Sequence, residues 1–207
     1  MAFAGLTLVL GVFIASVPVR ASGASEAFAQ MVIDDGYGIL NSTTLSSVER
    51  SRQFRDFMLG LTDVRRIALF TLGPYVNSAS PADVEAFVET FAEYAVTVYE
   101  VRLSQYRGQT LKIVGSVDRA ADDSVVNSVV VNPSNPSGPA VRAAFRVRED
   151  GGGRPIITDM QVEGVWLAIN QRADFTSFLQ QNRGSLPALS ASLIQQTRQL
   201  RAAGNGE

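Results

Sequence analysis

The stretch AVRAAFRVREDGGGRPIITDMQVE, residues 140–163, decides the fold of this protein. Residues 140–148 alternate apolar and basic side chains, a period of two that is typical of a β-strand with one buried face. Residues 155–163 show the same period of two, with Ile156, Met160 and Val162 on one face, and Gly151-Gly152-Gly153 lies between the two segments. A glycine run that binds phosphate would open onto a helix, whereas this one joins two strands. The pattern therefore predicts an antiparallel β-hairpin with the glycines at its tip.

Two further strands are expected upstream of this hairpin. Residues 109–118 alternate in the same way, and residues 125–131 are β-branched almost throughout. Turn-forming residues fill the connection at 133–138, and all the connections are short. Short connections favour pairing between strands that are neighbours in sequence. We predict a four-stranded antiparallel meander.

Helical periodicity flanks the sheet on both sides. Gly73-Pro74 is a typical helix end, and Ser80-Pro81-Ala82-Asp83 is a typical helix start because serine caps free amides and proline suits the first helical position. Helices are expected over residues 25–72, with a break near Gly60, and over 80–103, 170–181 and 186–201.

The order helices, sheet, helices predicts the α+β class. A small twisted sheet has an apolar face that helices must cover. The predicted organisation is one domain at residues 30–201, preceded by a segment 1–29 and followed by a frayed tail at 202–207.

The composition excludes several kinds of chemistry. The chain has 207 residues and contains neither cysteine nor histidine. Cysteine nucleophiles, histidine bases, disulfides and zinc or haem sites with such ligands are therefore impossible. Lys112 is the only lysine and Ile113 follows it, so a phosphate-binding P-loop is excluded as well. The net charge is −2 and the arginines are scattered, which argues against a nucleic-acid partner.

The N-terminus predicts export. Residues 2–19 carry no charge and are slightly too short for a membrane span. Ala27-Phe28-Ala29 fits a signal-peptidase site, and Ser22-Gly23-Ala24 is a weaker candidate. We predict a secretory signal peptide at residues 1–29, with a retained anchor as the alternative.

Acidic residues offer little for metal binding or catalysis. Asp34-Asp35 and Asp122-Asp123 lack the spacing of a calcium loop and are expected to be solvated. Asp159 with Tyr94 or Tyr99 is the one enzyme-like combination, since a tyrosine donor and a carboxylate base can isomerise a ketosteroid. Strand alternation points Asp159 away from the core, which argues against this role.

An aromatic stripe on the long helix is more often part of a core than of a binding site. Phe87, Phe91 and Tyr94 would face sheet residues of uneven size, among them Ala143 and Phe145. Such a surface can leave an apolar cavity, which is where ligands bind.

Several segments together resemble the MlaC-type periplasmic phospholipid-binding family, also called the toluene-tolerance family. They follow one another in unbroken order from about Phe54 to Gln199, and no single piece is specific. The matching segments are Phe54-Arg55, Asp63–Ala68, Leu72–Tyr75, Ala79–Pro81, Phe87–Tyr99, Tyr106–Gln109, Gly138–Val141, Asp159, Glu163–Val165, Asn170–Arg172 and Phe175–Leu179.

This resemblance implies an NTF2-like fold with helices and sheet around an internal apolar cavity. It implies a periplasmic lipid carrier without catalysis or cofactor. The carrier would move phospholipid between an outer-membrane lipoprotein–porin complex and an inner-membrane ABC transporter with an MCE-domain component. A hopanoid or other polycyclic lipid is an alternative ligand, and an isomerase-like or hydratase-like enzyme is the alternative function.

The residues expected to line the lipid cavity are apolar and lie on the predicted helices and strands. They are Phe57, Val64, Ile67, Phe70, Phe87, Phe91, Tyr94, Val98, Val141, Ala143, Phe145, Val147, Met160, Val162 and Val165. The headgroup is expected near solvent, beside Tyr99, Arg142 or Arg172.

Overall fold

A computed structural model describes residues 23–104, 106, 108–133, 135, 138 and 140–204. The first 22 residues of the predicted signal peptide lie outside these described residues. The helices are α1 (Gly23–Leu40), α2 (Ser47–Gly60), α3 (Val64–Leu72), the 3₁₀ helix η1 (Gly73–Asn77), α4 (Pro81–Ser104), α5 (Leu167–Gln181) and α6 (Leu186–Gly204). The strands are β1 (Thr110–Ala120), β2 (Asp123–Val131), β3 (Val141–Glu149), β4 (Pro155–Val162) and β5 (Val165–Trp166).

The five strands form one antiparallel sheet in the order β1-β2-β3-β4-β5. The predicted α+β class and meander are confirmed, but the prediction of four strands was wrong by one. The additional strand, β5, has only two residues and pairs with the end of β4 through a tight turn at Glu163-Gly164. Both turn residues have positive φ, 47° and 85°, as a two-residue hairpin requires.

Polar side chains just before three of the helices set where those helices begin. Ser46, Asp63 and Ser80 each accept a hydrogen bond from the backbone N–H three residues later, which caps α2, α3 and α4. Gly73 ends α3 with a φ of 57°, and a Cβ there would lie 3.0 Å from Thr176 Cγ2. The predicted end at Gly73 therefore reflects both its backbone conformation and close packing against α5.

Two predicted domain boundaries fall inside helices. Residues 23–29, assigned to the signal segment, belong to α1, and Ala29 is completely buried. Residues 202–204, assigned to a frayed tail, lie within α6. In both places helical periodicity extends into segments whose small residues suggested an end.

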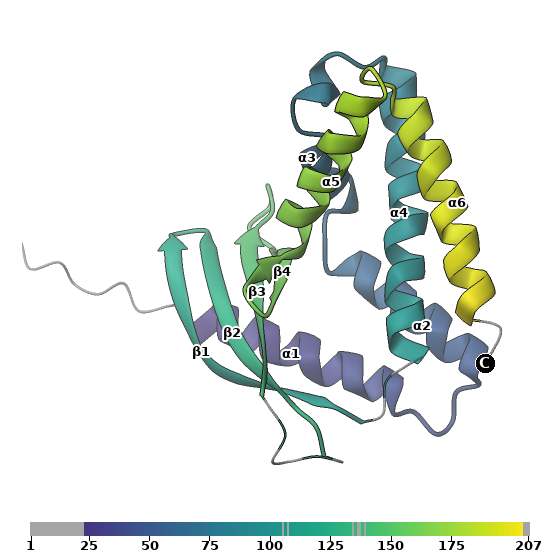
Figure 1. Ribbon diagram of the computed structural model, residues 1–207. Coiled ribbons are helices and arrows are strands. Elements are labelled where there is room, and N and C mark those ends of the chain that lie inside the picture. The colour runs from purple at the N-terminus through teal and green to yellow at the C-terminus, as the bar shows by residue number, and fades with distance from the viewer. Residues whose placement is uncertain are drawn as a thin grey trace, which may run out of the picture.

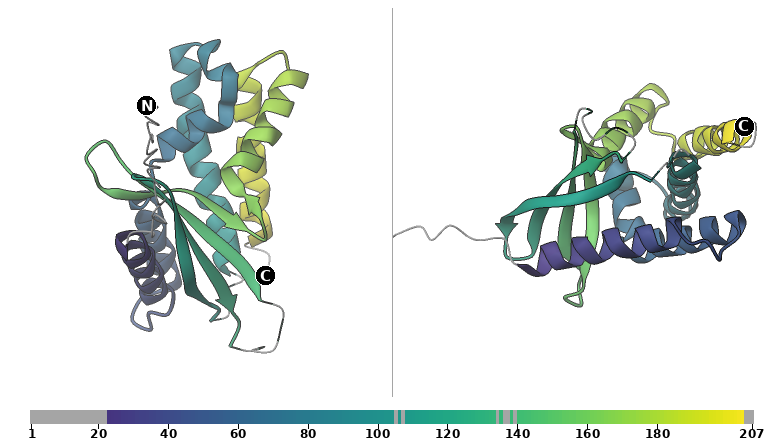
Figure 2. Two further views of the ribbon diagram at one scale, coloured as in Figure 1. Left: turned by 90° about the vertical axis from the view of Figure 1, so that its left-hand side faces the viewer. Right: turned by 90° about the horizontal axis from the view of Figure 1, so that it is seen from below.

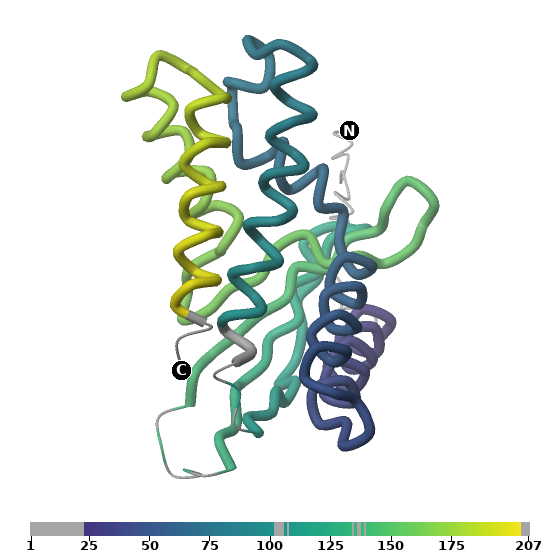
Figure 3. Tube along the Cα trace, turned by 90° about the vertical axis from the view of Figure 1, so that its right-hand side faces the viewer, coloured from purple at the N-terminus to yellow at the C-terminus, as the bar shows by residue number. Residues whose placement is uncertain are grey.

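Helices α3, α4, α5 and α6 lie together as a bundle beside the sheet (Figure 1). Figure 3 shows α4 and α6 running side by side along their length. Phe175 of α5 packs edge-on against Phe87 and Phe91 of α4, with ring centroids 5.9 and 6.2 Å apart. The buried cluster of this bundle comprises Ala68, Leu72, Val84, Phe87, Phe91, Phe175, Leu179, Leu186, Leu189 and Leu193.

The sheet has a separate core, which it shares with α1. In the view from below, α1 runs along one side of the sheet (Figure 2). Its buried residues Ala29 and Ile33 pack against Val126, Phe145 and Val147 of the sheet. The described residues thus form two hydrophobic clusters, one in the bundle and one under the sheet.

Helix α2 and the turn after it connect these two parts. Phe57 of α2 lies against α1, where a Cβ on Gly36 would sit 3.4 Å from its ring. Arg55 of α2 donates to Glu93 of α4 over 2.9 Å. The backbone N–H of Ile157 in β4 donates to Leu61 O over 2.8 Å, which joins the turn to the sheet.

Phe145 provides a direct test of the sheet core. Phe145→Ala should lower the free energy of unfolding by about 3–5 kcal/mol, because it removes a buried aromatic side chain and leaves a cavity. Phe70→Ala is the matched control, since Phe70 is 40% exposed and should lose clearly less. Urea unfolding followed by circular dichroism measures both, and equal losses would contradict the assignment of Phe145 to the core.

Candidate functional site

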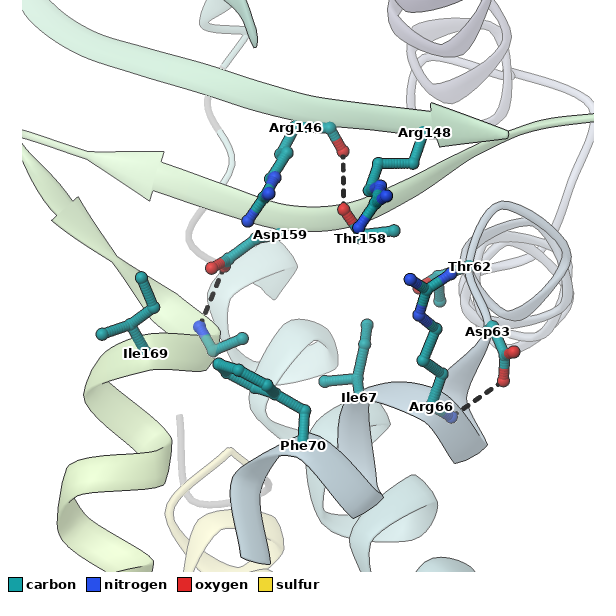
Figure 4. A pocket seen from close by; sticks show the side chains of 11 residues that line it. Thr62, Asp63, Arg66, Ile67, Phe70, Arg146, Arg148, Thr158, Asp159 and Ile169 are labelled. Carbon is teal, nitrogen blue, oxygen red and sulfur yellow. Dashed lines mark hydrogen bonds between the residues drawn. The ribbon is translucent and has the colours of Figure 1, made fainter. Parts of the chain in front are cut away.

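A pocket of about 280 Å³ opens between the bundle and the sheet, where α3 and α5 approach β3 and β4. Its walls come from residues 62–70 and from three short segments within residues 146–169 (Figure 4). The lining residues are Thr62, Asp63, Arg66, Ile67, Phe70, Arg146, Arg148, Thr158, Asp159, Ala168 and Ile169.

The pocket has a polar side and an apolar side. In Figure 4, Arg66 and Arg148 lie on one side, next to Thr62 and Thr158. Phe70 and Ile169 lie on the other side, below the Asp159 carboxylate and Arg146, and both apolar side chains are substantially exposed. A ligand with a polar group and a hydrocarbon part would match this division.

Asp159 links the sheet to the start of α5 by hydrogen bonds. Its Oδ1 accepts hydrogen bonds from the backbone N–H groups of Met160, at 2.8 Å, and Ala168, at 2.9 Å. The side chain of Trp166, at the N-cap position of α5, makes no capping hydrogen bond. Asp159 therefore supplies a cap from a neighbouring strand. Burial raises its pKa, and the hydrogen bonds from the two amides partly oppose that rise.

The expected outward position of Asp159 was wrong. The residue is buried and lines the pocket. Alternation along β4 placed it correctly on the face opposite Met160, but α5 and α3 adjoin that face, so it is not a solvent face. A single strand cannot reveal this, because covering helices follow from tertiary packing.

Asp123 was also wrongly expected to be solvated. It is buried and receives two hydrogen bonds from the Arg146 guanidinium, from Nε at 2.9 Å and Nη2 at 2.6 Å. These hydrogen bonds lower the pKa of Asp123 below its ordinary value. Asp122 is more exposed and pairs with Arg148 Nη2 at 3.0 Å. Both acids thus orient arginines of the pocket wall.

Two polar atoms of the pocket wall are buried without a hydrogen-bond partner among the described residues. They are Thr62 Oγ1 and Arg148 Nε. Sequence reasoning missed Thr62, Arg66 and Arg148 as site residues. A signal existed in the alternating arginines of β3, but alternation alone assigned that face to solvent.

The predicted lining residues are divided between several places. Ile67 and Phe70 line the pocket. Val64, Phe87, Phe91 and Tyr94 belong to the bundle cluster, and Phe145, Val147 and Met160 belong to the cluster under the sheet. The remainder lie elsewhere: Ala143 is buried in β3, Phe57, Val98 and Val162 are half-buried, and Val141 and Val165 are exposed. The structure therefore does not bring all fifteen residues to one surface.

The three predicted headgroup residues have different surroundings, and no contact joins them among those described below. The Arg172 guanidinium lies 4.9 Å from the centre of the Phe70 ring, which adjoins the pocket. Arg142 is exposed, and its Nη2 lies 3.8 Å from Glu163 Oε2. Tyr99 is half-buried on α4 and is not among the pocket residues.

The described part of the chain holds neither a metal site built from acidic residues nor a membrane-spanning helix. No group of three or more acidic side chains there could hold a metal ion. No helix among those residues combines the length and the apolar character needed to cross a bilayer.

Comparisons with known proteins agree with this architecture. A family model described as MlaC protein matches residues 30–195. The chain is also similar to the solved structure of a phospholipid-binding protein from Ralstonia solanacearum in complex with a phospholipid. The TM-score is 0.70 and the sequence identity 24%, over 84% of this chain and 97% of that chain. At this identity the structural likeness shows a shared fold.

The Asp123–Arg146 pair predicts a pH dependence of stability. A carboxyl group whose pKa is lower in the folded state stabilises the fold above its unfolded pKa of about 3.9, and this contribution is lost as the pH falls through the folded pKa. At pH 7, Asp123→Asn should cost about 3 kcal/mol, because it breaks a largely buried pair. The difference from wild type should shrink as the pH falls below about 4.

Unfolding by urea between pH 7 and pH 3 measures this difference in the free energy of unfolding. Asp159 is present in both proteins, so its titration contributes equally to both and does not affect the difference. Asp122→Asn is the control, since its more exposed pair should contribute less than about 1 kcal/mol. A difference for Asp123→Asn that stays constant over this range would contradict the assignment.

Proposed function

The chain belongs to the MlaC family, and on that premise we propose that it is a carrier of phospholipid and not an enzyme. The observation that carries the proposal is the family match over residues 30–195. The phospholipid in the structure of the similar Ralstonia solanacearum protein supports it, as does a pocket with one polar and one apolar side.

Energetics explain why a phospholipid needs a carrier in water. Burying one methylene group is worth about 0.8 kcal/mol, so two acyl chains of about fifteen methylenes each represent about 24 kcal/mol. Exposure of that surface would make unassisted transfer very slow. The apolar side of the pocket, with Ile67, Phe70 and Ile169, is where we place the start of the chains.

The pocket must widen to accept whole acyl chains. Its volume of about 280 Å³ is near the lower end of the ~300–1,000 Å³ range of small-molecule sites. One wall belongs to the bundle and the other to the sheet, and each part has its own hydrophobic cluster. Separation of the walls would leave each cluster with its own packing, but it would strain the Asp159–Ala168 and Ile157–Leu61 hydrogen bonds that join them. Deeper predicted residues such as Phe91 and Phe145 would then lie behind the walls as support.

The geometry gives little support to the enzyme alternative. Asp159, the candidate base, accepts hydrogen bonds from two backbone amides. Neither Tyr94 nor Tyr99 lines the pocket with it. The acid and the donor of a ketosteroid-isomerase arrangement are therefore not adjacent.

We further propose the cellular setting that family membership suggests. The carrier works in the periplasm and moves lipid between an outer-membrane lipoprotein–porin complex and an inner-membrane ABC transporter with an MCE-domain component. Such a carrier needs neither a nucleophile nor a titrating base, which agrees with the lack of cysteine and histidine.

Lipid that co-purifies with the protein tests the carrier proposal. The exported protein should carry diacyl phospholipid, identified by extraction and mass spectrometry. Ile169→Glu should reduce the bound lipid by more than about tenfold, because a carboxylate at the apolar side must lose its hydration when the chains bind. Ile169 is 51% exposed, so this variant should still fold.

Ile194→Glu is the matched control for that experiment. Ile194 is 41% exposed on α6 and lies away from the pocket. It should keep wild-type lipid content. A bound polycyclic lipid would favour the alternative ligand, and wild-type protein without any lipid would refute the carrier proposal.

The N-terminal residue of the exported protein tests the signal peptide. We propose cleavage after Ala24 instead of after Ala29, because residues 25–29 pack in α1. Ala29 is completely buried, and Glu26 accepts a hydrogen bond from Ser116 of β1. Intact-mass spectrometry of periplasmic protein should give Ser25 as the first residue.

Two arginine variants separate the candidate cleavage sites, because signal peptidase requires small residues at these positions. Ala24→Arg should block cleavage. Ala27→Arg changes only the second candidate site, at an exposed position, and should be processed normally. A mature protein that begins at Gln30 would contradict the proposal.

A further inference from the structure

The polar side of the pocket contains buried hydrogen-bonding atoms that no described residue pairs with. Thr62 Oγ1 and Arg148 Nε are buried and have no hydrogen-bond partner among the described residues. Buried polar atoms are nearly always paired, because an unmade hydrogen bond leaves the cost of desolvation uncompensated. Both atoms belong to residues that line the same pocket, so a bound group there could satisfy them.

Arg66 adds a guanidinium to the same side of the pocket. Within the described part of the chain, no ion pair or side-chain hydrogen bond involves it. The neighbouring acid, Asp63, caps α3 by accepting the backbone N–H of Arg66 at 2.9 Å. Figure 4 shows the Arg66 side chain extending from α3 toward Thr62 and the β3–β4 wall.

The other carboxylates near the pocket already have partners. Asp122 pairs with Arg148 and Asp123 with Arg146, and Asp159 accepts two backbone amides. What remains on this side is a set of donors: the Arg66 guanidinium, Arg148 Nε and the Thr62 hydroxyl. Donors of this kind match the oxygens of a phosphate, which arginine binds in bidentate geometry.

We propose that Thr62, Arg66 and Arg148 form a phosphate subsite, and that the phosphodiester of a glycerophospholipid occupies it. This inference rests on the proposed carrier function and specifies its ligand class. With the phosphate on the polar side, the glycerol would lie across the pocket and the acyl chains would begin at Phe70 and Ile169. The subsite would select lipids that carry a phosphate over uncharged lipids with the same chains.

A competition between two lipids tests the subsite. Lipid-exchanged full-length mature protein is incubated with vesicles that contain equal amounts of dioleoyl-phosphatidylglycerol and dioleoylglycerol, then re-isolated, and its lipids are quantified by mass spectrometry. Wild type should retain the phospholipid over the dioleoylglycerol by a factor of about ten or more, because one charge-assisted hydrogen bond is worth at least that much. Arg66→Gln should lose about tenfold of that preference.

The control is Arg65→Gln, which makes the same change of charge one residue away. Arg65 pairs with Glu85 of α4 through both guanidinium Nη atoms and does not line the pocket. It should keep the wild-type preference. Equal loss in both variants would assign the effect to net charge and overturn the subsite.

Thr62→Val gives an independent test, because it removes a hydroxyl that has no hydrogen-bond partner in the described part of the chain. The melting temperature should stay unchanged or rise, while the preference for the phospholipid falls. A lower melting temperature with an unchanged preference would show that Thr62 has a structural role and would overturn its assignment to the subsite.

Inorganic phosphate distinguishes the lipid headgroup from a free ion. If phosphate, compared with chloride at equal ionic strength, raises the melting temperature of wild type but not of Arg66→Gln, while the lipids are retained equally, the site binds free phosphate and the headgroup assignment is overturned. Equal retention without any effect of phosphate overturns the subsite but leaves the carrier proposal intact. Retention of neither lipid would instead refute the carrier proposal itself.

Discussion

The hydrogen bond from the Ala168 N–H to the Asp159 carboxylate is the interaction on which the arrangement of the bundle and the sheet depends. A helix begins with backbone N–H groups that its own hydrogen bonds cannot satisfy. In α5 the carboxylate of a β4 residue accepts one of them, from Ala168. The sheet therefore fixes where and in which direction α5 starts. The other helices of the bundle pack directly or indirectly on α5, so this contact positions them relative to the sheet together with the hydrogen bond from Ile157 to Leu61.

This junction also explains why the pocket is partly polar. The sheet face toward α1 is apolar and buried with Phe145 and Val147, whereas the face toward α3 and α5 carries Arg146 and Arg148. Charged residues on a covered face must be paired or near a ligand, because burying an isolated charge is costly. Asp122 and Asp123, from the turn before β2 and from its first residue, meet much of that need.

The elements of the fold could be predicted from the sequence, but their assembly could not. Alternation located four strands, and the capping residues from Ser80 located the start of α4, because these signals are local. The break between α1 and α2 at residues 41–46 was missed, since helical periodicity was read through it. Strand β5 escaped prediction because two residues cannot show a period, although Glu163-Gly164 is a recognisable turn. Phe91 and Phe145 were expected to line one cavity and lie in separate cores. The role of Arg66 and Arg148 required knowing that a helix covers the arginine face of β3, which only tertiary structure reveals.

The hydrogen bond from Ile157 to Leu61 has a consequence for self-association. Strand β5 covers only the end of β4, so the rest of β4 would offer its amides to a strand of another molecule. The Ile157 N–H instead donates to Leu61 O, and the Met160 N–H donates to the Asp159 side chain. At the opposite edge, β1 is interrupted by irregular pairing near Val114 and Arg119. Both edges of the sheet are thus poor templates for edge-to-edge aggregation, a risk for any protein whose sheet is open at both sides.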